Sequence, residues 1–161
     1  MDVSYPPAVK TVINVLEKSE IAYEVRILDA PARHANQAAD LLTCPLGAIV
    51  KSLAFQREIS GEILMVLVSG KNRADPRRLN QILGGKVNPA QPEIVLAKTG
   101  YPVGAVPPVC INMKYPVVMD EDLLAYERVW GSAGAVNILI GLTPEALQRL
   151  THAQIANLKQ I

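Results

Sequence analysis

Two apolar runs, residues 49–56 and 62–68, constrain the fold of this 161-residue chain more than any other feature. Both runs have the length and the composition of β-strands. The five residues between them, 57–61, end in a glycine and suit a hairpin connection. Strands this apolar are typical of the centre of a sheet that is covered on both faces. We therefore expect a hairpin whose two strands lie in the middle of a sheet.

Helix signals appear before and after this pair. Pro6 or Pro7 can open a first helix, which ends near Ser19, and Asp75 followed by Pro76 supplies an N-cap and a first helical residue. Further helices are predicted around residues 38–42, at 76–83, at 92–98 and at 143–150. Further strands are predicted at 23–28, 115–119, 127–130 and 135–140.

Both hairpin-length and helix-length connections therefore join the strands. This combination predicts a mixed α/β fold, in which helices cover a central mixed, largely antiparallel sheet, rather than a strict βαβ winding. A length of 161 residues with 50% apolar content suits one domain, residues 1–161.

Composition excludes several classes of protein. A net charge of +1, from 16 basic and 15 acidic residues, is too small for a protein that grips nucleic acid through its global charge. Cys44 and Cys110 have no CxxC spacing and no histidine cluster, so neither a disulfide framework nor a zinc site is expected. The chain shows no signal peptide and no apolar run that could span a bilayer, which favours a reducing, cytoplasmic location. No phosphate-loop, dinucleotide, HExxH or nucleophile-elbow motif is present.

Two segments remain that can form a chemical site. Lys51 lies inside an apolar strand, where its charge is costly to bury unless it faces a pocket or a charged ligand. The loop at residues 100–108 is rich in glycine and proline, which allow close approach of a ligand and fix the intervening N–H groups. Such a loop can bind an anion or an ester oxygen. Each segment also has an ordinary explanation, because a lysine can extend from the end of a strand to water and such a loop can be a simple connection.

The order of these motifs resembles the YbaK and prolyl-tRNA-synthetase-associated editing domain family. The segments that carry the resemblance are residues 38–41, 49–53, 64–68, 99–108, 118–120 and 131–134. The resemblance implies a mixed α/β fold and a free-standing editing protein. It also implies hydrolysis of an amino acid wrongly esterified to the 3′ end of a tRNA, with no metal and no cofactor.

The resemblance also implies roles for individual residues. Lys51 matches the lysine that holds the 3′-terminal nucleotide and orients the ester, and the backbone of Gly104 positions the carbonyl and the attacking water. Ser132 lies in a small-residue loop, 131–134, that shapes the pocket. The other candidates for substrate binding are Gly100, Tyr101, Ala105, Pro108, Gly134 and His34. Two residues depart from the family pattern: His34 stands where many relatives have threonine, and Cys110 replaces a common glycine.

The chemistry needs little from the protein, because an aminoacyl ester is already activated. Lys51 can pair with phosphate, ribose or ester oxygens, and backbone N–H groups near Gly104 and Ala105 can stabilise an oxyanion. No protein nucleophile is required. Lys51 as a general base ranks lower, because the sequence gives no sign of a lowered pKa. Cys110 as a nucleophile is a third hypothesis, although a small apolar filler is the commoner role for such a cysteine.

A basic stretch follows the second strand of the hairpin. Lys71, Arg73, Arg77 and Arg78 are either solvated surface residues or contacts for acceptor-stem phosphates, and the sequence favours neither. His34 is more often a loop or cap residue than a catalyst.

The function predicted is therefore a trans-editing aminoacyl-tRNA deacylase acting on small or medium amino acids. Alanine or cysteine on tRNA(Pro) is the first expectation, with the 3′ acceptor end as the ligand and prolyl-tRNA synthetase as a candidate partner. The alternative is a non-catalytic module that binds a tRNA end or a nucleotide beside a synthetase. The sequence determines neither the amino acid nor the oligomeric state.

Overall fold

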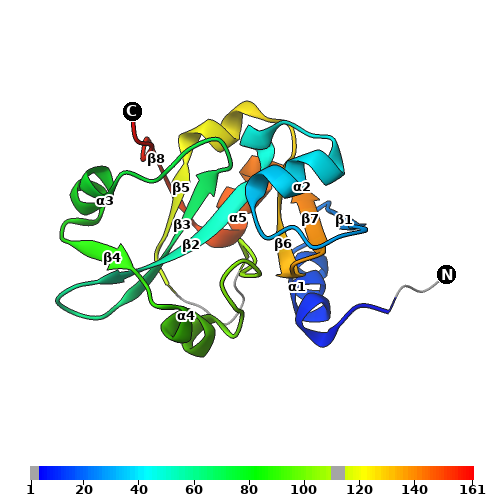
Figure 1. Ribbon diagram of the computed structural model, residues 1–161, viewed down its shortest axis with the longest axis horizontal. Helices are drawn as coiled ribbons and strands as arrows, with labels where there is room; N and C mark the ends of the chain where they lie inside the picture. The colour runs from blue at the N-terminus through cyan, green and yellow to red at the C-terminus, as the bar shows by residue number, and fades with distance from the viewer. Residues whose placement is uncertain (1–3, 110–114) are drawn as a thin grey trace.

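The computed structural model describes residues 4–109 and 115–161 (Figure 1). The helices are α1 (Pro7–Lys18), α2 (Ala35–Leu42), α3 (Pro76–Leu83), α4 (Pro92–Thr99) and α5 (Pro144–Thr151). The strands are β1 (Glu24–Ile27), β2 (Val50–Arg57), β3 (Ile63–Ser69), β4 (Val87–Pro89), β5 (Val117–Asp120), β6 (Val129–Ala135), β7 (Ile138–Leu142) and β8 (Gln154–Ala156). Two short 3₁₀ helices are η1 (Leu46–Ala48) and η2 (Glu121–Ala125).

The predicted hairpin is the centre of the larger sheet. β2 and β3 pair antiparallel, with Val50 opposite Ser69 and Gln56 opposite Ile63. The strand order is β4-β2-β3-β5-β8, in which β4 is antiparallel to β2, while β5 runs parallel to both β3 and β8. Every residue of β3 is buried, as its apolar run predicts for a strand covered on both faces.

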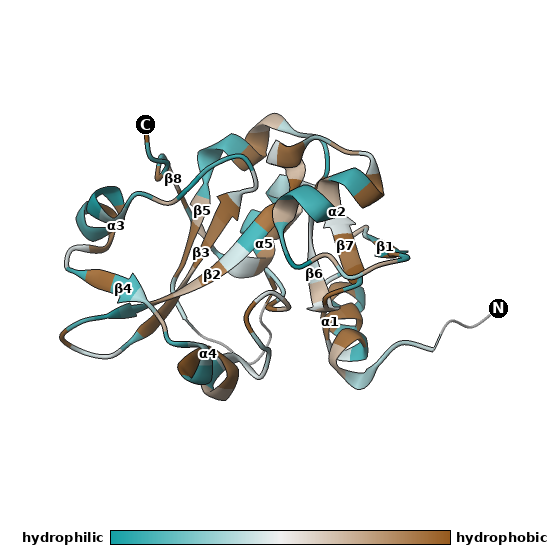
Figure 2. Cartoon of the chain, viewed as in Figure 1, coloured by the Kyte–Doolittle hydropathy of each residue, from teal (hydrophilic) through white to brown (hydrophobic). Residues whose placement is uncertain are grey.

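The packing on β3 explains that burial. Leu64, Val66 and Val68 lie on one face, in a hydrophobic cluster that includes Leu79 of α3 and Val118 of β5. Met65 faces the other way and packs with Val95 of α4. Since successive side chains of a strand alternate between faces, one apolar strand carries two separate parts of the core. Figure 2 shows this concentration of hydrophobic residues along β3.

The remaining strands form a second, antiparallel sheet with the order β1-β7-β6. Helix α1 packs on this sheet through Val9, Val12 and Leu16. Helix α2 lies in front of the sheet in the view of Figure 1. The mixed α/β class is thus confirmed, but the strands divide into two sheets instead of one central sheet. The hydrophobic pattern predicts strands without stating which of them pair, so this division could not be read from it.

The chain at residues 127–142 also differs from the prediction. The small residues 131–134, predicted as a loop, belong to β6, and the predicted strand 135–140 contains the turn between β6 and β7. Pairing with β7 and packing against Pro108 hold Gly131 in the strand, and an irregularity between Ser132 and Ala135 interrupts the register. A bulge of this kind accommodates residues of low strand propensity.

The local sequence signals predicted the ends of α3 and the start of α5 correctly. The Asp75 side chain accepts a hydrogen bond from the Arg77 N–H at 2.9 Å, and Gly84 ends α3 in the left-handed region at φ 71°. The Thr143 side chain accepts from the Ala146 N–H at 3.1 Å at the start of α5. Strands β4 and β8 were not predicted, because three-residue strands carry almost no pattern of their own. Within the described ranges, every helix is too short or too polar to cross a membrane.

Candidate active site

The candidate site lies at the boundary between the two sheets. Ile49, just before β2, forms an isolated parallel bridge to Trp130 of β6, and β4 pairs with β2 only from Phe55 onwards. Among the described residues, the edge of β2 between these two contacts has no strand partner. The alternation of the ladder directs the N–H and C=O of Ser52 toward this open edge, as it directs the Ala54 carbonyl, which accepts from the Ala90 N–H at 3.0 Å.

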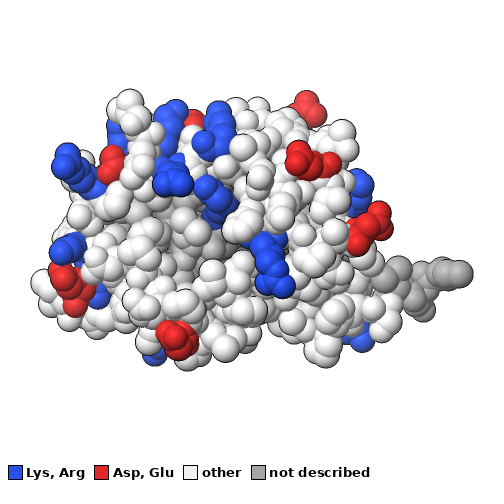
Figure 3. Space-filling model, viewed as in Figure 1, with Lys and Arg blue, Asp and Glu red and all other residues white. Residues whose placement is uncertain are grey.

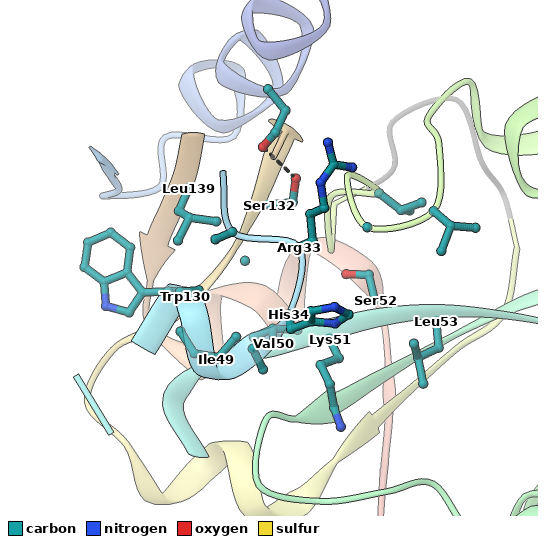
Figure 4. Close-up of a pocket in the computed structure, with 18 residues that line it drawn as sticks. Arg33, His34, Ile49, Val50, Lys51, Ser52, Leu53, Trp130, Ser132 and Leu139 are labelled. Atoms are coloured by element: carbon teal, nitrogen blue, oxygen red, sulfur yellow. Dashed lines mark hydrogen bonds between the residues drawn. The ribbon is translucent and has the colours of Figure 1, made fainter. Parts of the chain in front are cut away.

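A cavity of about 260 Å³ occupies this seam (Figure 4). Its walls come from α2 and the loop before it, from β2, from the loop after α4, and from β6 and β7. The apolar part includes Ala35, Ala38, Trp130 and Leu139, and the ionisable residues among those that line it are Arg33, His34 and Lys51. The cavity therefore offers an apolar wall and a positive potential, which suits an anionic or ester-bearing ligand.

Lys51 lies on the β2 wall of this cavity and is half-buried. Its ammonium donates a hydrogen bond to the backbone carbonyl of Asn72, in the loop that follows β3. Burial lowers the pKa of Lys51 below its usual range, the nearby positive charge of Arg73 lowers it further, and the carboxylate of Asp120 opposes both. The lowered pKa is a property that the sequence did not reveal, and it brings Lys51 closer to the range of functional lysines.

The loop after α4 forms the opposite wall. Gly104 lines the cavity with φ 89°, a left-handed conformation that glycine adopts without strain. The N–H of Ala105 donates to the Pro102 carbonyl at 3.0 Å, and its carbonyl accepts from the Ser132 hydroxyl at 3.1 Å. The N–H of Ala105 is thus engaged within the loop, which leaves Gly104 as the candidate donor to an oxyanion.

Ser132 joins this loop to β6. Besides its bond to Ala105, its hydroxyl lies 3.4 Å from the carbonyl of Ala135 and accepts from the Gly134 N–H at 3.1 Å. Ser132 lines the cavity, and the bond to Ala135 is the dashed line in Figure 4. The hydroxyl therefore fixes the shape of the bulge in β6 as well as facing the cavity.

The structure brings together Lys51, Gly104, Ser132 and His34 on the cavity wall. The other five candidates for substrate binding lie outside the lining and support it. Gly100 caps α4, and Tyr101 donates from its hydroxyl to the Ala8 carbonyl at 3.3 Å. Ala105 is buried, Pro108 packs against Gly131, and a Cβ on Gly134 would lie 2.9 Å from the Tyr101 ring.

His34 also has a structural role. It is the N-cap residue of α2, and its N–H donates to the side-chain carbonyl of Gln37 at 3.2 Å. Its ring lines the cavity beside Lys51 in Figure 4. Capping and facing the cavity are compatible, because the first uses the backbone and the second the side chain.

The basic candidates lie away from the cavity wall. Lys71 and Arg73 are in the loop after β3, and Arg77 and Arg78 are in the first turn of α3. Lys71 lies 4.0 Å from Asp122, and Arg78 lies 3.9 Å from Asp75, so both have a local acidic neighbour. Arg73 is the one whose charge reaches Lys51.

Two features of the site were missed from the sequence. Ser52 follows Lys51, and its hydroxyl oxygen is buried with no hydrogen-bond partner among the described residues. Ser52 lines both the main cavity and a neighbouring one of about 200 Å³ near α4. A serine in an apolar strand was a readable signal, since a buried hydroxyl without a partner is costly. Arg33, by contrast, stood in a loop with no pattern to distinguish it.

Cys110 lies outside the described residues, so its predicted role stays open. Cys44 is partly buried, and burial raises the pKa of its thiol. Within residues 4–109 and 115–161, no three His, Cys, Asp or Glu side chains are grouped so that they could hold a metal ion.

Comparison with known proteins gives consistent results. Residues 29–150 match the family described as "Aminoacyl-tRNA editing domain". The chain is 29% identical over 125 residues to the Enterococcus faecalis protein "Putative Cys-tRNA(Pro)/Cys-tRNA(Cys) deacylase EbsC", covering 77% of this chain and 76% of that one. It is 26% identical over 132 residues to "Uncharacterized protein YwhH" of Bacillus subtilis, covering 82% and 83%.

A solved structure is similar over nearly its whole length. The crystal structure of "a putative trans-editing enzyme for prolyl tRNA synthetase" superposes with a TM-score of 0.89 at 40% identity, covering 98% of this chain and 100% of that one. The fold of this chain, with its two sheets, is therefore one that a solved structure shares.

Proposed function

This chain belongs to the aminoacyl-tRNA editing domain family, and we propose from that premise that it removes alanine or cysteine from tRNA(Pro). The protein is an aminoacyl-tRNA deacylase of the trans-editing type. Cysteine and tRNA(Pro) are supported by the relative whose name mentions Cys-tRNA(Pro), and the link to proline charging by the solved structure whose description mentions prolyl-tRNA synthetase. Prolyl-tRNA synthetase is the proposed partner, and the cytoplasm, where tRNAs are charged, the proposed location.

The observation that carries the proposal is the cavity itself. A volume of about 260 Å³ is below the range of about 300–1,000 Å³ that is usual for pockets holding whole small-molecule ligands. It suits the aminoacyl end of the ester, with the nucleotide bound at the mouth. The apolar side chains of Ala35, Ala38 and Leu139 can surround a small side chain, while Lys51 and Arg33 supply positive charge for phosphate or ribose oxygens.

The reaction follows from this placement. A water molecule attacks the carbonyl carbon, the tetrahedral intermediate collapses, and the ribose oxygen leaves and takes a proton, so that a free amino acid and an uncharged tRNA result. The Gly104 N–H is proposed to donate to the developing oxyanion, and Lys51 to hold the nucleotide and stabilise the leaving oxygen. No covalent bond to the protein is needed, because the ester is already activated.

The proposal is tested with a panel of mischarged tRNAs, beginning with alanyl- and cysteinyl-tRNA(Pro), by following release of the labelled amino acid. Wild type is compared with Lys51→Ala and with Lys10→Ala, a matched variant on the exposed face of α1. We expect selective hydrolysis by wild type and Lys10→Ala, and a loss of at least about 100-fold in Lys51→Ala, the size typical for removing one stabilising donor.

Two outcomes would contradict the proposal. Full activity in Lys51→Ala would remove this lysine from the reaction. Binding of tRNA without hydrolysis of any member of the panel would favour the alternative of a non-catalytic module that recognises a tRNA end.

A further inference from the structure

A hydrogen-bond chain connects the Lys51 ammonium to two carboxylates that have no role in the reaction above. Lys51 donates to the Asn72 backbone carbonyl. The side-chain amide of Asn72 donates to Oδ2 of Asp120 at 2.9 Å and to Oδ2 of Asp122 at 2.8 Å. One residue, Asn72, thus contacts the lysine through its backbone and the acids through its side chain.

Asp120 is the fixed end of this series of hydrogen bonds. It lies at the end of β5, is 1% exposed, and accepts from the Ser69 N–H at 3.0 Å as well as from Asn72. Its second oxygen accepts from the Asp122 N–H at 3.0 Å. A buried carboxylate that accepts several hydrogen bonds is a rigid anchor, because leaving any of these donors unpaired is costly. The loop after β3 is therefore held at both Ser69 and Asn72.

The outer end of this series of hydrogen bonds, Asp122, is bonded to the C-terminal segment of the protein. Lys159 donates to Asp122 at 3.1 Å, and the Gln160 N–H donates to the Arg73 carbonyl at 2.8 Å. The hydrogen bonds from Asn72 and Lys159 hold the pKa of Asp122 below its usual range. The carboxylate is thus charged at neutral pH, and the loop that carries Asn72 is fixed from two sides.

We propose that Asp120 and Asn72 are positioning residues for Lys51 in the deacylation reaction. The Asn72 carbonyl holds the ammonium in one orientation on the side of the cavity that faces the loop after β3, and Asp120 holds Asn72. This arrangement reduces the conformational freedom that a long lysine side chain would otherwise lose when substrate binds. The inference rests on the proposed function, because it gives a role to residues that act through Lys51.

The proposal has an electrostatic consequence with a defined sign. The charged groups around the Lys51 ammonium are Arg73, which disfavours its charged form, and Asp120, which favours it, and the His34 ring lies beside Lys51 on the cavity wall. A carbonyl acceptor also favours the charged form. Removing the Asp120 charge or releasing the Asn72 carbonyl should therefore lower the pKa of Lys51 further. Lys51 would then lose its charge at a lower pH than in wild type.

The test compares Asp120→Asn and Asn72→Ala with wild type and with Ser69→Ala. Ser69→Ala is the matched control, because it removes the bond from the Ser69 hydroxyl to the Gly47 carbonyl at 2.7 Å. It therefore perturbs the end of β3, where the loop begins, and leaves the hydrogen bonds that lead to Lys51 in place. Acetylation of Lys51 by acetic anhydride is followed by peptide mass spectrometry as a function of pH, which reports its pKa whether or not the protein has activity. The pH profile of kcat/KM on the best mischarged tRNA is measured beside it.

We expect Asp120→Asn and Asn72→Ala to react with the anhydride at lower pH than wild type. We also expect them to lose about tenfold in kcat/KM, equivalent to about 1.4 kcal/mol, and to lose activity at a lower alkaline pH. Ser69→Ala should lose stability but keep the Lys51 pKa. The positioning role is overturned when both variants keep the wild-type reactivity of Lys51. If no tRNA is hydrolysed at all, the proposed function fails, while the labelling result still decides whether the two residues control Lys51.

Discussion

Two serines in neighbouring strands illustrate how burial alone does not determine a residue's role. Ser69 of β3 is fully buried, and its hydroxyl donates to the Gly47 carbonyl at 2.7 Å. Ser52 of β2 has a buried hydroxyl with no partner among the described residues, and it faces the cavity. A hydroxyl left without a partner weakens the fold, so Ser52 is best explained by a ligand that supplies the missing bond.

This contrast leads to a prediction of opposite effects. Ser69→Ala should lower the free energy of unfolding by about 1–2 kcal/mol, because it leaves the Gly47 carbonyl unsatisfied. Ser52→Ala should leave stability within about 0.5 kcal/mol of wild type or raise it, yet it should raise KM for mischarged tRNA. Urea unfolding and initial deacylation rates measure the two effects. Ser52→Ala with unchanged kinetics would leave the hydroxyl without a function in binding.

At the residue scale, only those site residues that are unusual among their sequence neighbours could be predicted from the sequence. Lys51 and the two glycines of the 100–108 loop stood out because each contradicts its local context: Lys51 is a charge in an apolar strand, and Gly100 and Gly104 are flexible positions among prolines. The bond between Asn72 and Asp120 could not be foreseen, because the two residues are 48 positions apart and each is ordinary in its own segment. Their contact exists only once β3 and β5 have paired.

Among the elements, the described part of the loop after α4, residues 100–109, is the one whose backbone conformation bears most directly on the proposed reaction. Gly104 has φ 89°, and a Cβ placed on it would meet no atom within 4 Å. A side chain there would be strained by its backbone but not by contacts, and it would stand at the cavity wall. Gly84, at the end of α3, has φ 71° and equally open surroundings far from the cavity.

We predict that Gly104→Val and Gly84→Val lose similar stability, about 1–2 kcal/mol each, because both place a β-branched residue in the left-handed region. Only Gly104→Val should lower deacylation, since only it alters the wall that faces the ester. Thermal unfolding and single-turnover rates on the same preparations distinguish the two effects. Equal rates in the two folded variants would exclude the loop from the mechanism.

Element boundaries were predictable where the signal is local. Asp75, Gly84 and Thr143 mark helix ends through their own side chains or backbone, so the predicted and observed bounds agree closely. Residues 131–134 were assigned wrongly because small residues have low strand propensity, and pairing with β7 overrides that preference. The two sheets themselves depend on long-range pairing, which no local pattern states.

At the scale of the whole molecule, a net charge of +1 conceals an uneven surface. Figure 3 shows basic side chains gathered over α3 and the loop after β3, on the same face as the open side of β2. Lys71 and Arg73 belong to this loop, and Arg77 and Arg78 belong to α3. A local basic surface beside the site is a suitable place for the phosphates of an acceptor stem.

We predict that Arg77→Ala combined with Arg78→Ala weakens tRNA binding more at low salt than at high salt. The slope of log K against log salt concentration should become shallower by about 1–2, as expected for the loss of one or two phosphate contacts. Filter binding across a salt series measures it, with Lys10→Ala combined with Lys18→Ala on α1 as the matched control. An equal loss of affinity at every salt concentration would contradict phosphate contact.

The order of assembly follows from the way β1 is paired. β1 lies near the start of the chain, yet its only strand neighbour among the described residues is β7, close to the other end, with Glu24 opposite Gly141. Contacts between distant parts of a chain form late, because the loop between them must close first. During synthesis, the hairpin of β2 and β3 can form while β6 and β7 are still missing, but the cavity cannot. We therefore expect a nascent or truncated chain to be inactive until β6 and β7 are in place, so that editing activity reports that the cavity has been assembled.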